Sequence, residues 1–111
     1  MLIGIIPDTS HAETLLNNLS EADFNLADVS ILMSDLKKRN LIAKDEGPMK
    51  SWDLSNLVPN LTKKGIPSPK AEYCIEAIKQ GKVLFAMNIS DKSRSAASEM
   101  IKDNSGEIIQ E

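Results

Sequence analysis

The sequence predicts an α+β fold, in which helices pack on a four-stranded antiparallel sheet. Two very apolar runs, at 2–6 and 83–89, have the length and composition of strands that are buried inside a sheet. Two more polar runs, at 29–33 and 107–110, are typical of strands at the sheet edges. Segments with helical spacing separate these runs. The arrangement matches the ferredoxin-like architecture, with strand order 4-1-3-2, helices on one face and a helical insertion between strands 2 and 3.

The chain is expected to form one domain over residues 1–111, because 111 residues is close to the commonest domain size. The pattern is weakest between 36 and 66, where Gly47-Pro48 and Gly65 interrupt any long element. We expect an irregular connection there. Apolar residues at helical spacing from Leu54 to Leu61 predict a short helical stretch within it.

The first half begins with the strand at 2–6, which ends at Pro7. Ser10 and Glu13 have the spacing of a capping box, in which each side chain accepts a hydrogen bond from a free backbone amide. A helix is therefore expected to begin at Ser10. Its apolar residues fall on one stripe, made of Ala12, Leu15, Leu16 and Leu19. The strand at 29–33 alternates in part, which favours an edge position.

The second half begins with a helix that starts at Ser68-Pro69, where a hydroxyl can cap and proline needs no hydrogen bond. It stops at Gly81, a residue suited to a left-handed cap. Its inner stripe is made of Ala71, Cys74, Ile75 and Ile78. After the second apolar strand, a helix is expected from Ser90-Asp91 to Gly106, followed by the short strand at 107–110.

An all-parallel sheet with the same strand order is the alternative, if the helix at 68–80 is a crossover between parallel strands. Strands of parallel sheets are covered on both faces and are therefore apolar throughout. Glu107–Gln110 is too polar for an interior strand of that kind. The antiparallel sheet is therefore preferred.

Composition argues against several classes of function. The formal charge is −3 and the isoelectric point is about 5.2, which opposes nucleic-acid binding through phosphate neutralisation. The few aromatic residues are scattered singly and give no surface for stacking bases. No apolar run reaches about eighteen residues, so no membrane span is expected. The lone cysteine, Cys74, and the absence of a signal-peptide pattern predict a cytoplasmic protein.

Several glycine, proline and apolar motifs lie in two parts of the chain, roughly 1–35 and 61–110. They are Gly4-Ile5-Ile6, Phe24, Asp28-Val29-Ser30-Ile31, Gly65-Ile66-Pro67, Ala71-Glu72-Tyr73, Ile78, Gly81 and Val83-Leu84. In these motifs the chain resembles the bacterial general stress or low-temperature-induced protein family. It departs from that family at Lys37–Asn60, which is polar where many relatives carry a glycine-rich apolar insert. The resemblance implies a small α+β domain and a stress context, and it assigns no catalytic residues.

No group of residues in the sequence has a catalytic pattern. His11 is the only histidine and has no second histidine or cysteine at metal-ligand spacing, so we expect no metal site. Cys74 lies on the apolar face of its helix, where a buried thiol is inert. No glycine-rich loop that would hold a phosphate is present. We therefore expect no cofactor and favour a non-enzymatic protein.

The polar connection offers the best candidate for a ligand or partner surface. Its apolar cluster is made of Trp52, Leu54, Leu57 and Val58. Such a cluster outside the main elements covers a pocket or meets a partner, or else it folds onto the sheet face that the helices leave bare. A basic triplet precedes it, made of Lys37, Lys38 and Arg39. The triplet either contacts an acidic partner or is a solvated loop.

These observations favour a small stress-associated binding or interaction module without enzymatic activity. A sheet that is covered on one side leaves an apolar face, which a second copy would cover, so we expect a homodimer. The alternative is a small enzyme or ligand-binding protein whose pocket lies between the bare sheet face and the segment around Trp52. A deep pocket with several converging polar groups would favour that alternative.

Overall fold

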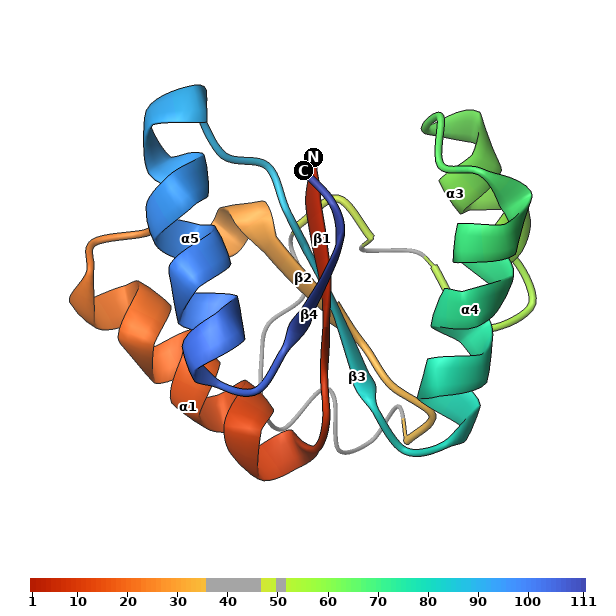
Figure 1. Cartoon of the computed structure of the whole chain (residues 1–111), viewed down its shortest axis with the longest axis horizontal. Coiled ribbons are helices and arrows are strands. Elements are labelled where there is room, and N and C mark those ends of the chain that lie inside the picture. The colour runs from red at the N-terminus through yellow and green to blue at the C-terminus, as the bar shows by residue number, and fades with distance from the viewer. Residues whose placement is uncertain (36–46, 50–51) are drawn as a thin grey trace.

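The computed structural model describes residues 1–35, 47–49 and 52–111. In chain order the elements are β1 (Leu2–Ile6), α1 (Thr9–Glu21), the 3-10 helix η1 (Leu26–Asp28), β2 (Val29–Leu32), α3 (Leu57–Lys63), α4 (Ser68–Lys79), β3 (Val83–Met87), α5 (Asp91–Asp103) and β4 (Glu107–Gln110) (Figure 1). The described residues therefore form an α+β structure with one four-stranded sheet and four α-helices.

Every neighbouring strand pair in the sheet is antiparallel, and the strand order is β2-β3-β1-β4. Counted from the β4 edge, these are the neighbours that the order 4-1-3-2 names. β1 and β3 form the central pair, in which Leu2 lies opposite Met87 and Ile6 opposite Val83. The predicted central and edge positions of the four strands are confirmed, and the parallel alternative is wrong.

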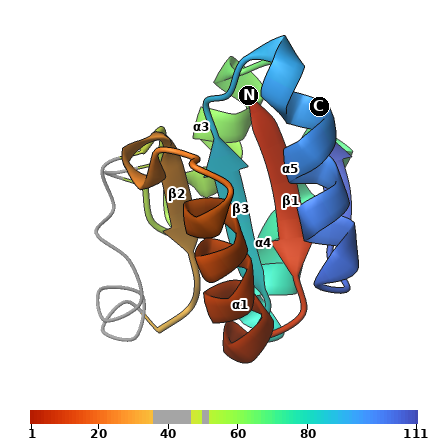
Figure 2. The same cartoon turned by 90° about the vertical axis from the view of Figure 1, so that its left-hand side faces the viewer.

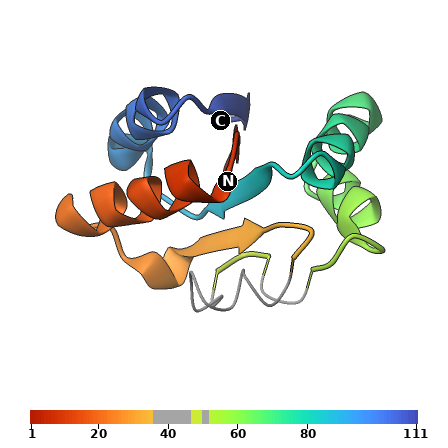
Figure 3. The same ribbon diagram turned by 90° about the horizontal axis from the view of Figure 1, so that it is seen from below.

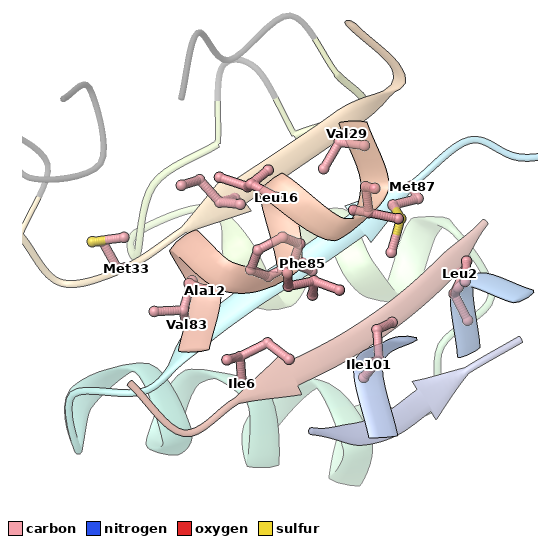
Figure 4. Close-up of a cluster of buried hydrophobic side chains, with 14 residues drawn as sticks. Leu2, Ile6, Ala12, Leu16, Val29, Met33, Val83, Phe85, Met87 and Ile101 are labelled. Carbon is pink, nitrogen blue, oxygen red and sulfur yellow. The ribbon is translucent and has the colours of Figure 1, made fainter. Parts of the chain in front are cut away.

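α1 and α5 pack against each other on one face of the sheet (Figure 2). The predicted inner stripe of α1 is buried there, as are Ala97 and Ile101 of α5. Figure 4 shows how these helices meet side chains of β1 and β3, with the fully buried Phe85 among them. We call this apolar cluster the first core.

α3 and α4 cover the opposite face of the sheet, so the prediction of helices on one face is wrong (Figure 1). β1 and β3 are buried at every position, and both of their faces therefore need apolar cover. α4 provides much of it, through Ala71, Cys74, Ala77 and Ile78. α3 adds Leu57 and Leu61. This second core makes the molecule a three-layer structure, with helices on both sides of the sheet.

The uncovered sheet face expected from the sequence is therefore not present. Ile3 and Ile5 of β1, and Leu84 and Ala86 of β3, point into the second core instead of toward a partner. Both the predicted face-to-face homodimer and the predicted pocket between the sheet and the Trp52 segment required that bare face. Because α3 and α4 cover that face, this reason for expecting either arrangement is removed, and both stay predictions.

The segment Gly47–Met49 lies beside β2, on the side away from β3 (Figure 3). The backbone N–H of Met49 donates to the buried Oγ of Ser30 at 2.8 Å. A Cβ atom on Gly47 would come to 2.5 Å from the backbone carbon of Val29, so only glycine permits this close approach. This segment therefore covers the outer edge of β2.

Three predicted helix ends differ from what the sequence suggested. At the start of α4 the N-cap residue is Pro67, and no side chain caps the helix. α1 begins at Thr9 and is capped by Asp8, not by Ser10. α5 ends at Asp103, before Gly106. A Cβ atom on Gly106 would lie 2.5 Å from Cγ2 of Ile101, so this glycine is required by close packing of the chain against α5.

Candidate binding site

The predicted apolar cluster lies against the second core. Leu57 is fully buried, whereas Trp52, Leu54 and Val58 are half-buried and pack against its margin. The basic residues predicted to accompany them, Lys37, Lys38 and Arg39, lie outside the described residues. The four apolar residues therefore all pack in or against the second core. Their contact with a ligand or partner stays a prediction.

Asp53 holds the turn that leads from Trp52 into α3. Its Oδ1 accepts hydrogen bonds from the hydroxyl of Ser55 and from the backbone N–H of Ser55, the latter at 2.9 Å. These two hydrogen bonds, in that order of importance, lower the pKa of the Asp53 carboxyl below its usual value. The polar side of this turn therefore faces solvent while its apolar residues pack inward.

A groove lies between the first half of α4 and the edge strand β4. Its volume is about 310 Å³, at the lower end of the range for ligand sites. Its walls are Pro69, Lys70 and Tyr73 from α4 and Glu107, Ile108 and Ile109 from β4. We call it the α4–β4 groove. It combines apolar side chains with one ammonium, one phenol and one carboxylate.

Two polar contacts join the walls of the groove. The hydroxyl of Tyr73 donates to Oε2 of Glu107 at 2.7 Å, and Nζ of Lys70 donates to the backbone carbonyl of Ile109 at 3.3 Å. The hydrogen bond to Glu107, followed by the negative charge of that carboxylate, raises the pKa of Tyr73 above its usual value. Tyr73 is therefore a neutral donor near pH 7. Tyr73 is 44% exposed, which makes it one of the exposed large hydrophobic residues in the described part of the chain.

Cys74 lies directly after Tyr73, on the buried side of α4. Burial, followed by the negative charge of Glu107, raises the pKa of its thiol to about 11. A thiol that stays protonated near pH 7 is a poor nucleophile and a poor metal ligand. The prediction that Cys74 is a core residue is confirmed.

The two edges of the sheet differ in what lies beside them. The outer side of β2 is covered by Gly47–Met49, whereas β4 pairs only with β1 among the strands that the structure describes. Ile109 of β4 points into the second core and Ile108 packs against the first core. β4 is therefore firmly anchored, yet none of the strands in the described part of the chain lies on its outer side. An edge of this kind can accept a further strand.

The sequence did not single out Lys70, Tyr73 and Glu107 as site residues. One signal for Tyr73 was present, because it falls outside the apolar stripe that Ala71 and Cys74 define on the same helix. An aromatic residue that does not face the core is a common sign of a contact surface. Glu107 gave no such signal, since its proximity to α4 depends on which face of the sheet that helix covers.

Comparisons with protein-family models, with curated proteins and with solved structures found no match to this chain. Within residues 1–35, 47–49 and 52–111, no cluster of three or more His, Cys, Asp or Glu side chains has the arrangement needed to hold a metal ion. In the same residues, no helix has the length and apolar character needed to cross a membrane.

Proposed function

We propose that this chain is a non-enzymatic binding module that captures an extended peptide segment in the α4–β4 groove, alongside the edge of β4. The observation that carries the proposal is the combination of an open edge strand and an adjoining groove of about 310 Å³. Edge strands bind extended peptides through backbone hydrogen bonds, and pockets beside the strand select among side chains. The groove supplies both kinds of contact.

Lys70 gives the proposed site a charge preference. Its ammonium donates to the carbonyl of Ile109, where the backbone N–H of an added strand would also donate. An incoming peptide that takes over this carbonyl releases Lys70, whose charge then needs a new partner. An acidic side chain on the peptide meets that need. We therefore propose that the captured segment carries Asp or Glu at the position that faces Lys70.

Tyr73 and Glu107 supply the second part of the proposed site. The hydroxyl of Tyr73 is already bound to the carboxylate of Glu107, so its ring is held in one position before a ligand arrives. A preorganised aromatic side chain loses little freedom on binding, and tyrosine is a frequent energetic centre of protein interfaces. The exposed ring of Tyr73 is suited to contact an apolar side chain of the peptide.

The residues around the groove support binding more than catalysis. Catalysis by a nucleophile requires an activated side chain close to a base. The thiol nearest the groove, that of Cys74, is buried and has a pKa of about 11. The only histidine, His11, belongs to α1, on the opposite face of the sheet from α4, and its Nδ1 lies 2.8 Å from Oδ1 of Asp8.

We also propose that the core of this fold is a ferredoxin-like unit with an inserted helical pair. The support is the order β1-α1-β2-β3-α5-β4, the antiparallel sheet, and the shared face of α1 and α5. On this view α3 and α4 form the insertion, and the α4–β4 groove lies where the insertion meets the original sheet edge.

The homodimer, the cytoplasmic location and the stress context stay predictions. With both sheet faces covered, the β4 edge is the described surface on which two copies would most directly join their sheets. The location is supported by the single cysteine, and the stress context by the resemblance of short motifs.

The proposal is tested with three synthetic pentapeptides that share alternating valines and carry Glu, Gln or Lys at both intervening positions. Binding is followed by the shifts of backbone amide resonances in β4 and the first half of α4 during titration at low salt. We expect the Glu peptide to bind most tightly and to perturb residues 107–110. Lys70→Glu should weaken the Glu peptide about fivefold or more and favour the Lys peptide.

Lys79→Glu provides the matched control, because Lys79 lies on the same helix in its last turn and pairs with Glu76 outside the groove. It should leave the preference for the Glu peptide unchanged. If none of the peptides perturbs β4, the proposal is wrong. If Lys70→Ala makes the protein self-associate in sedimentation and leaves peptide binding unaltered, Lys70 protects the edge and does not recruit a ligand.

A further inference from the structure

A second cavity lies on the outer side of α5, away from the α4–β4 groove. Its volume is about 290 Å³. It is lined by residues of α5 and by Glu111, which follows β4; the α5 residues are Asp91, Arg94, Ser95, Ser98, Glu99 and Lys102. This surface was not a candidate in the sequence, which indicated only a helix from Ser90-Asp91 to Gly106.

Two of the residues that line this cavity carry a buried hydrogen-bonding group without a partner. Ser98 is only 5% exposed, and its Oγ makes no hydrogen bond. Nε of Arg94 is likewise buried and unpaired. Buried polar groups are nearly always hydrogen-bonded, so each exception calls for a physical reason. Here the two exceptions belong to residues that lie four positions apart on one helix and line the same cavity, so they share one face of α5.

The charges around the cavity alternate in sign. Arg94 pairs with Asp91 through its NH2 group at 3.2 Å, which leaves its Nε free. Among the residues that the structure describes, Glu99, Lys102 and Glu111 form no ion pair. A simple anion would be repelled by the carboxylates of Glu99 and Glu111. A simple cation would be repelled by Arg94 and Lys102. A small molecule with both charges fits the pattern better than either.

We propose that this cavity binds a small zwitterion of the free α-amino acid class. Its carboxylate accepts hydrogen bonds from Nε of Arg94 and Oγ of Ser98. Its ammonium group interacts with the carboxylates of Glu99 and Glu111. Burial of the two donors makes the carboxylate end the more specific one, because a ligand without it leaves both donors unpaired. This site is independent of peptide capture in the α4–β4 groove.

The test is a titration of the whole protein with each of the common α-amino acids, with acetate and methylammonium chloride as single-charge probes. Binding is read from the backbone amide resonances of residues 94–102. We expect at least one amino acid to give saturable shifts there, while acetate and methylammonium at the same concentration do not. Saturation by no amino acid would overturn the proposal. Equal binding of acetate would overturn it as well, because the site would then be one for simple anions.

Substitutions of Ser98 and Arg94 can show whether their unpaired groups bind a ligand or are only imperfectly packed. Ser98→Ala should weaken the bound amino acid about tenfold or more, since a hydrogen bond to a charged group is lost. The same change should leave the melting temperature of the free protein unchanged or raised, because it removes an unpaired buried hydroxyl. Arg94→Lys retains the charge but lacks the Nε donor, and it should weaken binding to a similar degree.

Ser20→Ala is the control, because Ser20 is an exposed serine on α1 that does not line this cavity. It should change neither binding nor melting temperature. Full retention of binding by both Ser98→Ala and Arg94→Lys would show that the two unpaired donors do not hold the ligand, and the proposal would be wrong.

Discussion

The carboxylate of Asp8 caps the start of α1 by accepting a hydrogen bond from a free backbone N–H group. Its Oδ1 accepts from the backbone N–H of His11 at 2.8 Å and also contacts Nδ1 of the same residue at 2.8 Å. These contacts, the backbone one first, lower the pKa of Asp8 below its usual value of 3.8. The ionised form is therefore the one that stabilises the folded state.

The pH dependence of Asp8→Asn follows from this shift. Asparagine can cap the helix but cannot ionise, so the wild type should be the more stable protein at neutral pH. A carboxyl with a lowered folded pKa contributes stability above its unfolded pKa and loses it as the pH falls through the folded value. The difference in free energy of unfolding, measured by urea titration, should shrink below about pH 4. A constant difference down to pH 2 would contradict this role.

The buried thiol of Cys74 should make the free energy of unfolding decrease as the pH rises, whereas the contribution of Asp8 is lost as the pH falls. Its thiol has a folded pKa of about 11, against 9.0 as the usual value, so the unfolded chain ionises first. Stability from this group is complete below pH 9.0 and is lost as the pH rises toward 11. Urea titrations should show this loss in the wild type and a smaller one in Cys74→Ala, with the rest due to groups such as Tyr73.

At neutral pH, Cys74→Ala should cost about 1 kcal/mol or somewhat more, because a small cavity forms in the second core. The wild-type thiol should react slowly with a thiol reagent in the native state and rapidly in urea. Fast labelling of the native protein would contradict the burial that the structure gives it.

At the level of elements, α3 connects the predicted binding surface with the core. Leu57 is fully buried in the second core, whereas Val58, its neighbour, is half-buried at the margin. Leu57→Ala should therefore lower the free energy of unfolding by about 2–5 kcal/mol. Val58→Ala, the matched control, should cost much less. Similar small effects of both changes would indicate that Leu57 faces a partner, as the sequence suggested.

The placement of α4 shows the limit of sequence reasoning about elements. Periodicity identified its stripe of Ala71, Cys74 and Ile78 correctly, and Ser68-Pro69 marked its start. Nothing in a stripe specifies which face of a sheet it will cover, because either face of β1 offers apolar side chains. The same holds for Asp8 and Ser10, since both are good capping residues and the sequence cannot choose between them.

For the whole molecule, the sheet could be predicted and the α4–β4 groove could not. The strands were recognisable because fully apolar runs and mixed runs differ along the chain, and this difference also separates the centre of the sheet from its edges. The α4–β4 groove joins residues 69–73 to residues 107–109. Its existence depends on the side from which α4 approaches the sheet, which only the three-dimensional arrangement reveals.

The central pair of the sheet has a consequence for how the chain folds. Leu2 lies opposite Met87, so β1 and β3 join the beginning of the chain to a point far along it. Contacts of such high sequence separation require a large loop to close, and the chain loses that entropy before the contacts stabilise it. Such contacts therefore make folding slow. Local pieces, such as the α3–α4 pair and the α5–β4 pair, have contacts of short sequence separation that do not require β1. Until β1 is in place, β3 and β4 lack the strand that finally lies between them, and the molecule is most exposed to mispairing with other chains.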